Sequence, residues 1–329
     1  MVRSRPRATM TLSILLCIVV AISLVLLFGL KAVSGTITLT DDAGAVKAVP
    51  LTWWMIAFMM IVAFVCEYVD STLGMGYGTT LTPLLLLIGF QPLQIVPVIL
   101  LSELISGILA GVFHHHQGNV DFALRTKSVS ETVNRLRALG YVDTFKTDLP
   151  LHLKVALFLA ACSIVGTIAA VFVAVSIPKF WLNMYIGVLI VSMGIIIIIF
   201  FNREFHFSWR KIFCLGLIAS FNKGMSGGGY GPLVTSGQIL SGMEGKTAVG
   251  ITSLAEGLTC FVGIIAYVFF LKHNLDLQLA PYIVIGAVLS VPLSAMSVRR
   301  MSTRVLKSTI AIITIILGLL TIAKTFGLV

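Results

Sequence analysis

The fold of this chain is decided by the stretch Leu73-Gly74-Met75-Gly76-Tyr77-Gly78, which returns in altered form as Ser226-Gly227-Gly228-Gly229-Tyr230-Gly231. The offset that joins Gly74 to Gly227, applied without a gap, also joins Glu103 to Glu256. Chance explains a repeated Gly-Tyr-Gly and a repeated glutamate poorly in so apolar a sequence. We therefore expect an internal duplication whose helices are interrupted by glycine.

The composition is that of a protein embedded in a lipid bilayer. Hydrophobic residues make up 58% and charged residues 11%, whereas soluble domains average about 25% charged residues. Several stretches approach the roughly 20 apolar residues that a helix needs to cross the hydrocarbon. They are 11–30, 52–69, 93–113, 153–176, 181–201, 246–271, 282–298 and 307–322. The predicted fold is an all-α polytopic membrane protein with two inverted repeats and about eight to nine spans.

The net charge of +10 indicates how the chain is oriented in the membrane and does not indicate a nucleic-acid partner. The basic residues lie in short loops between spans, as expected of loops on the cytoplasmic side. The 114–152, 202–211 and 298–307 loops and the amino terminus are basic and are assigned to the cytoplasm. The connections 31–50, 177–181 and 272–280 are poor in basic residues and are assigned outside. We expect a multi-pass plasma-membrane protein with a cytoplasmic amino terminus. The 11–30 stretch exceeds the 7 to 15 apolar residues typical of a signal peptide, which favours a retained helix over a cleaved one.

This assignment makes the two copies antiparallel to one another. Residues 51–113 begin outside and end inside, whereas residues 212–271 begin inside and end outside. An inverted pair of this kind brings matched motifs together near the bilayer midplane, as in many secondary transporters. The chain then divides into an amino-terminal helix and outer loop at 1–50, the broken-helix segment of the first repeat at 51–113, a cytoplasmic linker at 114–152, the remaining helices of the first repeat at 153–201, and the second repeat at 212–329.

The glycine clusters predict helix breaks inside the membrane, because each glycine costs about 1 kcal/mol in a helix relative to alanine. The second break is expected at 222–231, and around it only 212–221 and 233–242 are apolar, so half-length helices and a re-entrant hairpin beside a cavity are expected. One interpretation is close helix packing through small residues. The other is an anion site built from freed N–H groups and helix amino termini. The predicted binding residues are Gly74, Gly76, Tyr77, Gly78, Thr79, Asn222, Lys223, Gly227, Gly229, Tyr230 and Gly231.

Four ionisable residues lie inside or beside these apolar segments, where a charge costs roughly 3 kcal/mol or more. Lys223 must face either an anion or an acidic side chain, and a pair with Asp70, its aligned position in the first copy, is one hypothesis. Glu103 and Glu256 are assigned to coupling or gating together with Asp70. Proton exchange, cation binding and hydrogen bonding to broken backbone remain three alternatives for the two glutamates.

Two further groups mark the ends of predicted helices. Trp53, Trp54 and Trp181 are typical of interfacial anchors on the outer side. The run 114–116 consists of three histidines, whose side chains point about 100° apart on a helix and so cannot chelate one metal together; an interfacial cluster is expected. The five cysteines have no paired spacing. No metal, cofactor or catalytic site is predicted.

The sequence resembles the TauE/SafE family of anion permeases, of the sulfite exporter and toluene sulfonate uptake type. The resemblance is carried by Leu73-Gly74-Met75-Gly76-Tyr77-Gly78 with Pro83 and Gly89, by His116-Gln117-Gly118-Asn119-Val120-Asp121, and by Ser226-Gly227-Gly228-Gly229-Tyr230-Gly231-Pro232. It implies two duplicated halves and transport of sulfur-containing or carboxylated anions, often coupled to an ion gradient. Met75 and Tyr77 depart from the denser glycine run of the family.

We accordingly expect an integral membrane permease, not an enzyme, that moves sulfite, a sulfonate or a related organic anion by alternating access. Backbone N–H groups of Gly76, Gly78, Gly229 and Gly231 would bind the anion, with Lys223 supplying positive charge. The expected partners are a small anionic solute, membrane lipid and protons as the coupling ion, and the oligomeric state is left open. The alternatives are a divalent-cation permease and a membrane scaffold or assembly protein.

Overall fold

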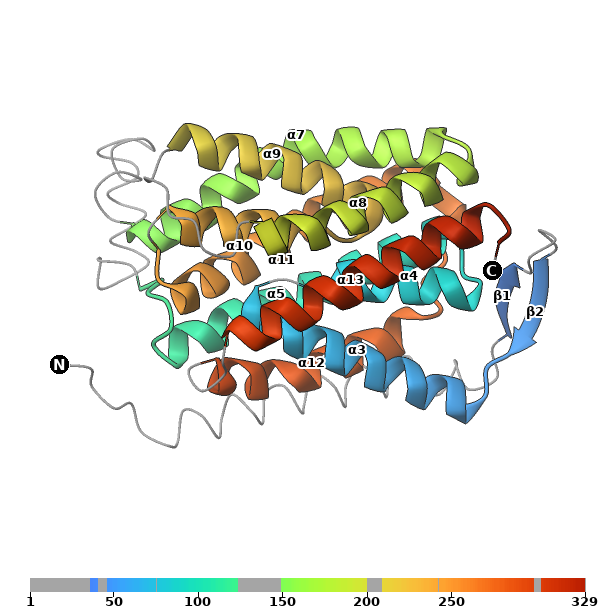
Figure 1. Cartoon of the computed structure of the whole chain (residues 1–329), viewed down its shortest axis with the longest axis horizontal. Helices are drawn as coiled ribbons and strands as arrows, with labels where there is room; N and C mark the ends of the chain where they lie inside the picture. Colours follow the sequence, from blue (N-terminus) through green and yellow to red (C-terminus); the bar gives the residue numbers. More distant parts are fainter. Residues whose placement is uncertain are drawn as a thin grey trace.

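The computed structural model describes residues 36–40, 46–74, 76–123, 149–199, 209–241, 243–298 and 303–328, and over most of them the chain is helical (Figure 1). The helices are α3 (Trp53–Leu73), α4 (Tyr77–Ile88), α5 (Pro92–His116), α7 (Leu151–Ser176), α8 (Lys179–Ile199), α9 (Trp209–Ser226), α10 (Tyr230–Leu240), α11 (Gly245–Leu271), α12 (Ala280–Ser297) and α13 (Thr303–Thr325), with a 3-10 turn at Lys272–Asn274. Strands β1 (Thr36–Thr40) and β2 (Val46–Pro50) form an antiparallel pair before α3.

Within the described ranges, six helices are long and apolar enough to cross a membrane: α3, α5, α7, α8, α11 and α12. Each overlaps a predicted apolar stretch, with boundaries that agree within two residues for most of them. The stretch 307–322 lies in α13, whose described apolar part, Ala311–Thr325, is shorter than a full span. The predicted helix at 11–30 and the linker residues 124–148 lie outside the described residues. The total number of spans therefore stays a prediction.

Local signals set the helix boundaries. Thr52 caps α3 by accepting a hydrogen bond from the Met55 N–H at 3.4 Å. Gln91 and Gln94 form a capping box at the start of α5. Pro92 fits the first turn because the N–H group that proline lacks would have no partner within the helix at that position. Gly89 ends α4 in a left-handed conformation that a residue with a Cβ rarely adopts.

Both glycine clusters break their helices, as predicted, and both breaks are shorter than expected. The first break is at 74–76, with φ of 68° at Gly74 and 138° at Gly76. The second is at 227–229, with φ of 72° at Gly227 and 79° at Gly229. The half-length prediction holds for α4, of 12 residues, and α10, of 11 residues. In Figure 1, α4 lies toward the end of the molecule that carries β1 and β2, and α10 lies toward the opposite end.

The prediction that the second break begins at residue 222 is wrong, because α9 continues through 18 residues to Ser226. Asn222 and Lys223 remain helical since their side chains find partners across the bundle. Gly224 also stays helical because it lets α9 approach α7: a Cβ there would lie 2.7 Å from the Cβ of Ala170. Tertiary contacts thus keep Asn222 and Gly224 helical although both residue types have low helix propensity.

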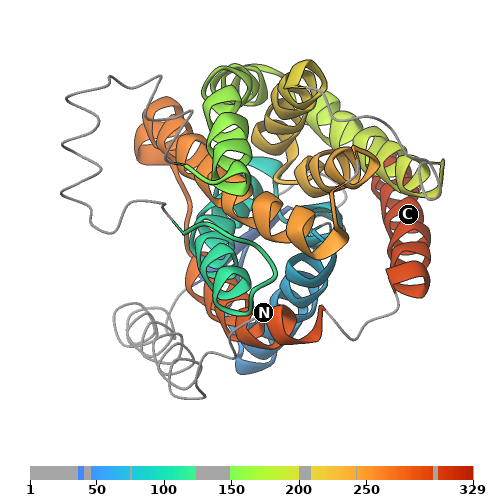
Figure 2. The same cartoon turned by 90° about the vertical axis from the view of Figure 1, so that its left-hand side faces the viewer.

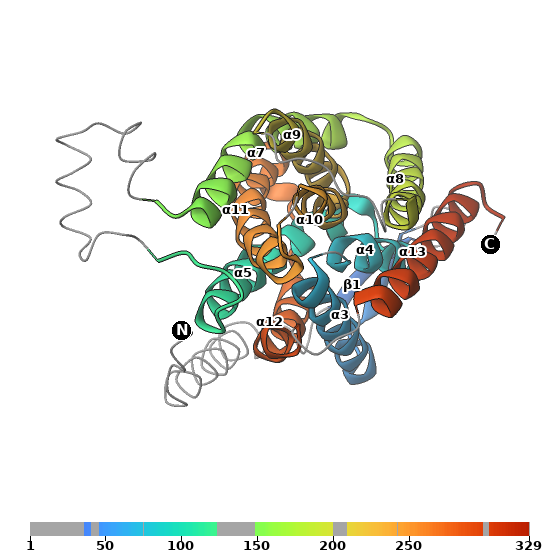
Figure 3. The ribbon, with the colours of Figure 1, turned by 60° about the vertical axis from the view of Figure 1, so that its left-hand side comes forward.

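The helices pack in pairs around a central contact between α5 and α11. Helix α3 packs on α12 and α9 packs on α7, while α12 and α7 cover α5 and α11 respectively. Helices α8 and α13 lie side by side at one edge, as Figure 2 and Figure 3 show. Glycines allow the central contact: a Cβ on Gly107 would lie 2.8 Å from the Ser253 carbonyl oxygen, and one on Gly257 would lie 2.9 Å from the Ile108 nitrogen.

The outer surface of the bundle is apolar. Large side chains such as Phe172, Phe269 and Val165 are exposed on helices long enough to span a bilayer. Trp53 and Trp54 are exposed at the start of α3, next to β2, and Trp181 is exposed near the start of α8. These positions suit lipid contact along the helices and aromatic anchoring at their ends.

Replacement of Gly257 by alanine tests the central contact. The new methyl group would meet backbone atoms of α5, which cannot rotate away, so the Gly257→Ala change should lower the free energy of unfolding by about 1–3 kcal/mol. Gly245→Ala, at the first residue of α11 with no atom within 4 Å of the added Cβ, is the matched control and should leave stability unchanged or slightly raised. Thermal unfolding in detergent measures both. Equal midpoints for the two variants would contradict a close contact between α5 and α11.

Candidate functional site

Lys223 lies at the centre of the candidate site and is fully buried, with 0% exposure. Its ammonium group donates a hydrogen bond to Glu256 Oε1 at 2.7 Å and forms an ion pair with Glu103 Oε2. Glu103 projects from α5, Glu256 from α11 and Lys223 from α9. The two glutamates at matched positions of the duplication therefore share one buried cation.

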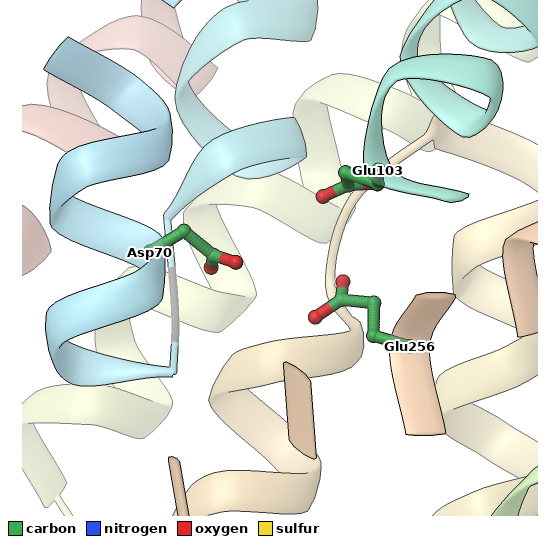
Figure 4. Close-up of side chains that lie close together, drawn as sticks. All are labelled: Asp70, Glu103 and Glu256. Carbon is green, nitrogen blue, oxygen red and sulfur yellow. The ribbon is translucent and has the colours of Figure 1, made fainter. Parts of the chain in front are cut away.

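Two further carboxylates of α3 adjoin this ion pair. Asp70, Glu103 and Glu256 each offer one oxygen, and these oxygens lie within 4.8 Å of one another; Figure 4 shows the three side chains pointing toward one another. Glu67 is one turn before Asp70, and its Oε1 accepts a hydrogen bond from the Ser71 hydroxyl at 2.6 Å. We call Glu67, Asp70, Glu103 and Glu256 the acidic cluster.

The predicted pair between Asp70 and Lys223 is not formed. Both partners of Lys223 are glutamates, which approach it from the crossing helices α5 and α11. Asp70 instead accepts a hydrogen bond from the Tyr77 N–H at 3.4 Å, across the first break. Hydrogen bonding of the glutamates to broken backbone is also not observed in the described part of the chain, where their partners are Lys223 and, for Glu103, the Cys260 thiol at 3.7 Å.

A small cavity of about 10 Å³ adjoins the acidic cluster. This is about the space that one water molecule needs. The cavity is lined by Glu67, Asp70, Glu103, Ser106, Gly107, Ser253 and Glu256. Three buried oxygens of its lining, Glu67 Oε2, Glu103 Oε1 and Ser106 Oγ, make no well-formed hydrogen bond to the described residues, although the Ser106 hydroxyl lies close enough to interact with the Glu67 carboxyl group.

The two glycine breaks are in direct contact. A Cβ added at Gly228 would lie 2.7 Å from the carbonyl carbon of Gly78 and from the nitrogen of Thr79, and one added at Gly78 would collide with the Gly227 carbonyl oxygen. The amino-terminal caps of α4 and α10 are Gly76 and Gly229, and neither helix has a side-chain cap. The first turns of both short helices therefore lie close to this backbone contact.

Two threonines at matched positions join the breaks reciprocally. Thr82 donates to the Ser226 carbonyl oxygen at 2.8 Å, and Thr235 donates to the Gly74 carbonyl oxygen at 2.7 Å. Each hydroxyl thus satisfies a carbonyl group at the end of the long helix in the other copy. The predicted site omitted Thr82, although its recurrence at the repeat offset was a visible signal.

The remaining predicted residues surround the contact. Tyr77 is buried and its hydroxyl group bonds Ser102 at 2.7 Å, whereas the buried hydroxyl of Tyr230 has no partner. Asn222 accepts a hydrogen bond from the Tyr185 hydroxyl at 2.7 Å. Because the breaks touch in this conformation, the N–H groups around Gly76, Gly78, Gly229 and Gly231 form an anion site only if the copies separate. That site stays a prediction.

A larger apolar cleft of about 640 Å³ opens between α7, α8 and α9 on the side of Asn222. It is lined by Val173, Ile177, Trp181, Met184, Tyr185, Val188, Leu189, Ser192, Phe221, Asn222 and Met225. Asn222 and Tyr185 supply most of its polarity, and Asn222 is adjacent in sequence to Lys223. Lys223 itself does not line the cleft. Nothing in the sequence distinguished Tyr185 from an ordinary interfacial tyrosine.

The expectation of an interfacial histidine cluster is wrong for His114, which is fully buried. Its Nε2 bonds the Ser71 carbonyl oxygen at 2.8 Å, and its Nδ1 bonds the Asn119 amide nitrogen at 3.0 Å. These partners imply a neutral ring that donates from Nε2 and accepts at Nδ1. Asn119 also donates to the Ala295 carbonyl oxygen at 3.1 Å. His114 and Asn119 therefore tie α3 and α12 to the end of α5.

Removal of one threonine hydroxyl tests the reciprocal bonds between the breaks. Thr82→Val keeps the shape of the side chain but leaves the buried Ser226 carbonyl group without this donor, which should cost about 1–3 kcal/mol of unfolding free energy. Thr321→Val is the matched control, because Thr321 is equally buried but bonds the Leu317 carbonyl oxygen within its own helix. Thermal unfolding compares the two. A larger loss for Thr321→Val would contradict the assigned role of Thr82.

Comparisons with known proteins agree with the membrane architecture. A model of the family "Sulfite exporter TauE/SafE" matches residues 58–129 and 138–321. The chain is similar to the "Probable membrane transporter protein YtnM" of Bacillus subtilis (strain 168), with 26% identity over 212 residues, and the match covers 60% of this chain and 60% of the relative. No solved structure matches the chain. With its membrane-spanning helices and this match over most of its length, the chain belongs to the sulfite exporter TauE/SafE family of membrane transporters.

Proposed function

We propose that the protein is a permease that moves a small anion, such as sulfite, a sulfonate or a related organic anion, by alternating access between two inverted repeats. The observation that carries the proposal is the fully buried Lys223, held between Glu103 and Glu256 beside the two glycine breaks. A buried cation is costly in a membrane. Its place near the glycine breaks, from which the amino termini of α4 and α10 start, suits recognition of a negative solute.

The packing pattern supports the inverted repeats. When α3, α4, α5, α7 and α8 are matched in order to α9, α10, α11, α12 and α13, the α3 to α12 contact corresponds to the α9 to α7 contact. Helices α5 and α8 each pack against their own counterparts, α11 and α13. Such self-matching contacts are expected of two copies related by a two-fold axis. The opposite placement of α4 and α10 in Figure 1 agrees with this relation.

The charges suggest how a coupling ion would favour anion binding. With Glu103 and Glu256 ionised, their charges outweigh the single positive charge of Lys223 and repel an anion. Proton binding to the glutamates releases the ammonium group from its partners and leaves it free to attract the anion. Proton and anion binding then favour one another, which is the coupling that an ion-driven permease needs. Separation of the touching breaks would complete the site with the N–H groups of Gly76, Gly78, Gly229 and Gly231.

Loss of the Lys223 charge should abolish anion movement. In proteoliposomes, Lys223→Gln should reduce counterflow of labelled sulfite or toluene sulfonate by roughly 100-fold or more, because the interaction of a buried charge is worth about 3 kcal/mol. Lys246→Gln is the control, since Lys246 forms a half-exposed pair with Glu244 away from the cluster. Undiminished counterflow in Lys223→Gln would remove the lysine from the anion site.

The two glutamates should carry the response to a pH gradient. Glu103→Gln and Glu256→Gln mimic the protonated carboxyl group permanently, so each should abolish stimulation of uptake by an inward proton gradient while leaving exchange at equilibrium measurable. The stimulation is measured as the ratio of uptake with the proton gradient to uptake without it, in the same proteoliposomes. A stimulation equal to that of the unaltered protein would exclude both residues from proton coupling.

A divalent-cation permease is the second candidate, because Asp70, Glu103 and Glu256 bring three carboxylate oxygens within 4.8 Å of one another. Oxygen ligands of this type suit hard divalent cations. The presence of Lys223 in the same cluster weighs against it, since the ammonium group already neutralises part of the charge. Uptake of a labelled divalent metal without anion counterflow would favour this candidate.

A further inference from the structure

The small cavity beside the acidic cluster has the features of a ligand site that Lys223 does not fill. Among the described residues, Glu67 Oε2, Glu103 Oε1 and Ser106 Oγ line it without a well-formed hydrogen bond. Their residues are 1%, 2% and 0% exposed. Buried polar atoms normally form hydrogen bonds with the protein or with a bound ligand. Three oxygens without such bonds in one cavity indicate a ligand that the protein atoms alone do not supply.

The charge of the surroundings indicates that this ligand is a cation. Four carboxylates line the cavity, and Lys223 is the one cationic side chain that pairs with them among the described residues. A water molecule would satisfy hydrogen-bonding oxygens without reducing the excess of negative charge. Glu103 belongs to both the ion pair and the cavity. Its Oε2 contacts Lys223, while its Oε1 faces the cavity and has no hydrogen-bond partner among the described residues.

Size and charge then select among cations. Oxygen ligands favour hard ions. Two oxygens that each lie about 2.3–2.6 Å from an ion, on opposite sides of it, are up to roughly 5 Å apart. The oxygens of Asp70, Glu103 and Glu256, which lie within 4.8 Å of one another, meet this condition. Mg²⁺ keeps several waters, for which a cavity of about 10 Å³ has no room. Ca²⁺ resembles Na⁺ in radius but takes 6–8 oxygen ligands, whereas Glu103 Oε2 and Glu256 Oε1 are already engaged by Lys223.

We propose that this cavity binds one Na⁺ ion and that the bound ion weakens the ion pairs of Lys223 with Glu103 and Glu256. The ligands are oxygens of Glu67, Asp70, Glu103, Ser106 and Glu256. The role as a coupling ion rests on the proposed anion transport. Sodium shares Glu103 with the lysine, so its arrival draws negative charge away from the ammonium group. Lys223 is then freer to bind an anion. Protons and Na⁺ compete for the same carboxylates.

Thermal unfolding of the purified full chain in detergent tests the site without any anion substrate. Ionic strength is held constant while choline chloride is replaced by the chloride of Na⁺, K⁺, Ca²⁺ or Mg²⁺. A ligand that binds the folded state raises the unfolding midpoint as its concentration exceeds the dissociation constant. Na⁺ should raise the midpoint more than any other ion. A response no larger than that to choline, or a larger response to Ca²⁺ or Mg²⁺, would overturn the sodium assignment.

Ser106→Ala is the decisive variant because it removes a cavity oxygen that makes no well-formed hydrogen bond to the described residues and interacts only with the Glu67 carboxyl group beside it. Stability in choline should be retained, whereas the apparent dissociation constant for Na⁺ should rise about tenfold or more, the loss typical of disturbed ion sites. Ser163→Ala is the matched control, since Ser163 is equally buried but bonds the Ala160 carbonyl oxygen within α7. An unchanged sodium response in Ser106→Ala would overturn the proposal.

Flux measurements separate this inference from the proposed function. Uptake of labelled sulfite and toluene sulfonate is compared under an inward Na⁺ gradient, an inward proton gradient and no gradient. Stimulation by Na⁺ that is lost in Ser106→Ala supports the coupling role, and stimulation by protons alone overturns it. If no anion moves under any gradient while Na⁺ still stabilises the protein, the anion permease fails and the sodium site stands.

Discussion

The buried ammonium group of Lys223 is the interaction on which the rest of this structure depends. An isolated charge at that depth costs several kcal/mol, so the lysine must have carboxylate partners close by. Glu103 and Glu256 provide them from the crossing helices α5 and α11, and this requirement directs the Lys223 side chain of α9 toward the contact between the two. The ion pair thus joins both copies of the duplication at one point. Any change in its charge affects both copies together.

Close backbone approach makes this arrangement possible. Gly107 and Gly257 let α5 and α11 cross without side chains between them, and Gly78 and Gly228 let the two breaks touch. The breaks leave carbonyl groups open, and the reciprocal hydroxyl groups of Thr82 and Thr235 satisfy two of them. Both interpretations of the glycines are therefore compatible: they serve packing in this conformation, and they leave helix amino termini that a separated pair would expose.

Much of the fold could be predicted because apolar length and glycine position are local properties. The stretches at 52–69 and 93–113 became α3 and α5, and the breaks fell inside the predicted glycine clusters. Pairing across the bundle could not be predicted. Asp70 aligned with Lys223 yet bonds the Tyr77 N–H, because α5 and α11 place their glutamates nearer to the lysine. His114 was expected at an interface and is buried, since a carbonyl group of α3 and an amide of the following loop face its ring.

By itself the sequence determined that the chain is membrane-embedded, that the segments around Gly74 and Gly227 resemble one another, and that Glu103, Glu256 and Lys223 lie in apolar surroundings. Composition and spacing are enough for these conclusions, because a charged residue in an apolar stretch and a glycine run that interrupts it can be recognised in the sequence without knowing any tertiary contact. Only the tertiary structure decided that both glutamates share one lysine and that Glu67, Ser106 and Glu103 leave oxygens free in a common cavity. Such groupings depend on how α3, α5, α9 and α11 cross, and crossing geometry is set by packing between residues far apart in the chain.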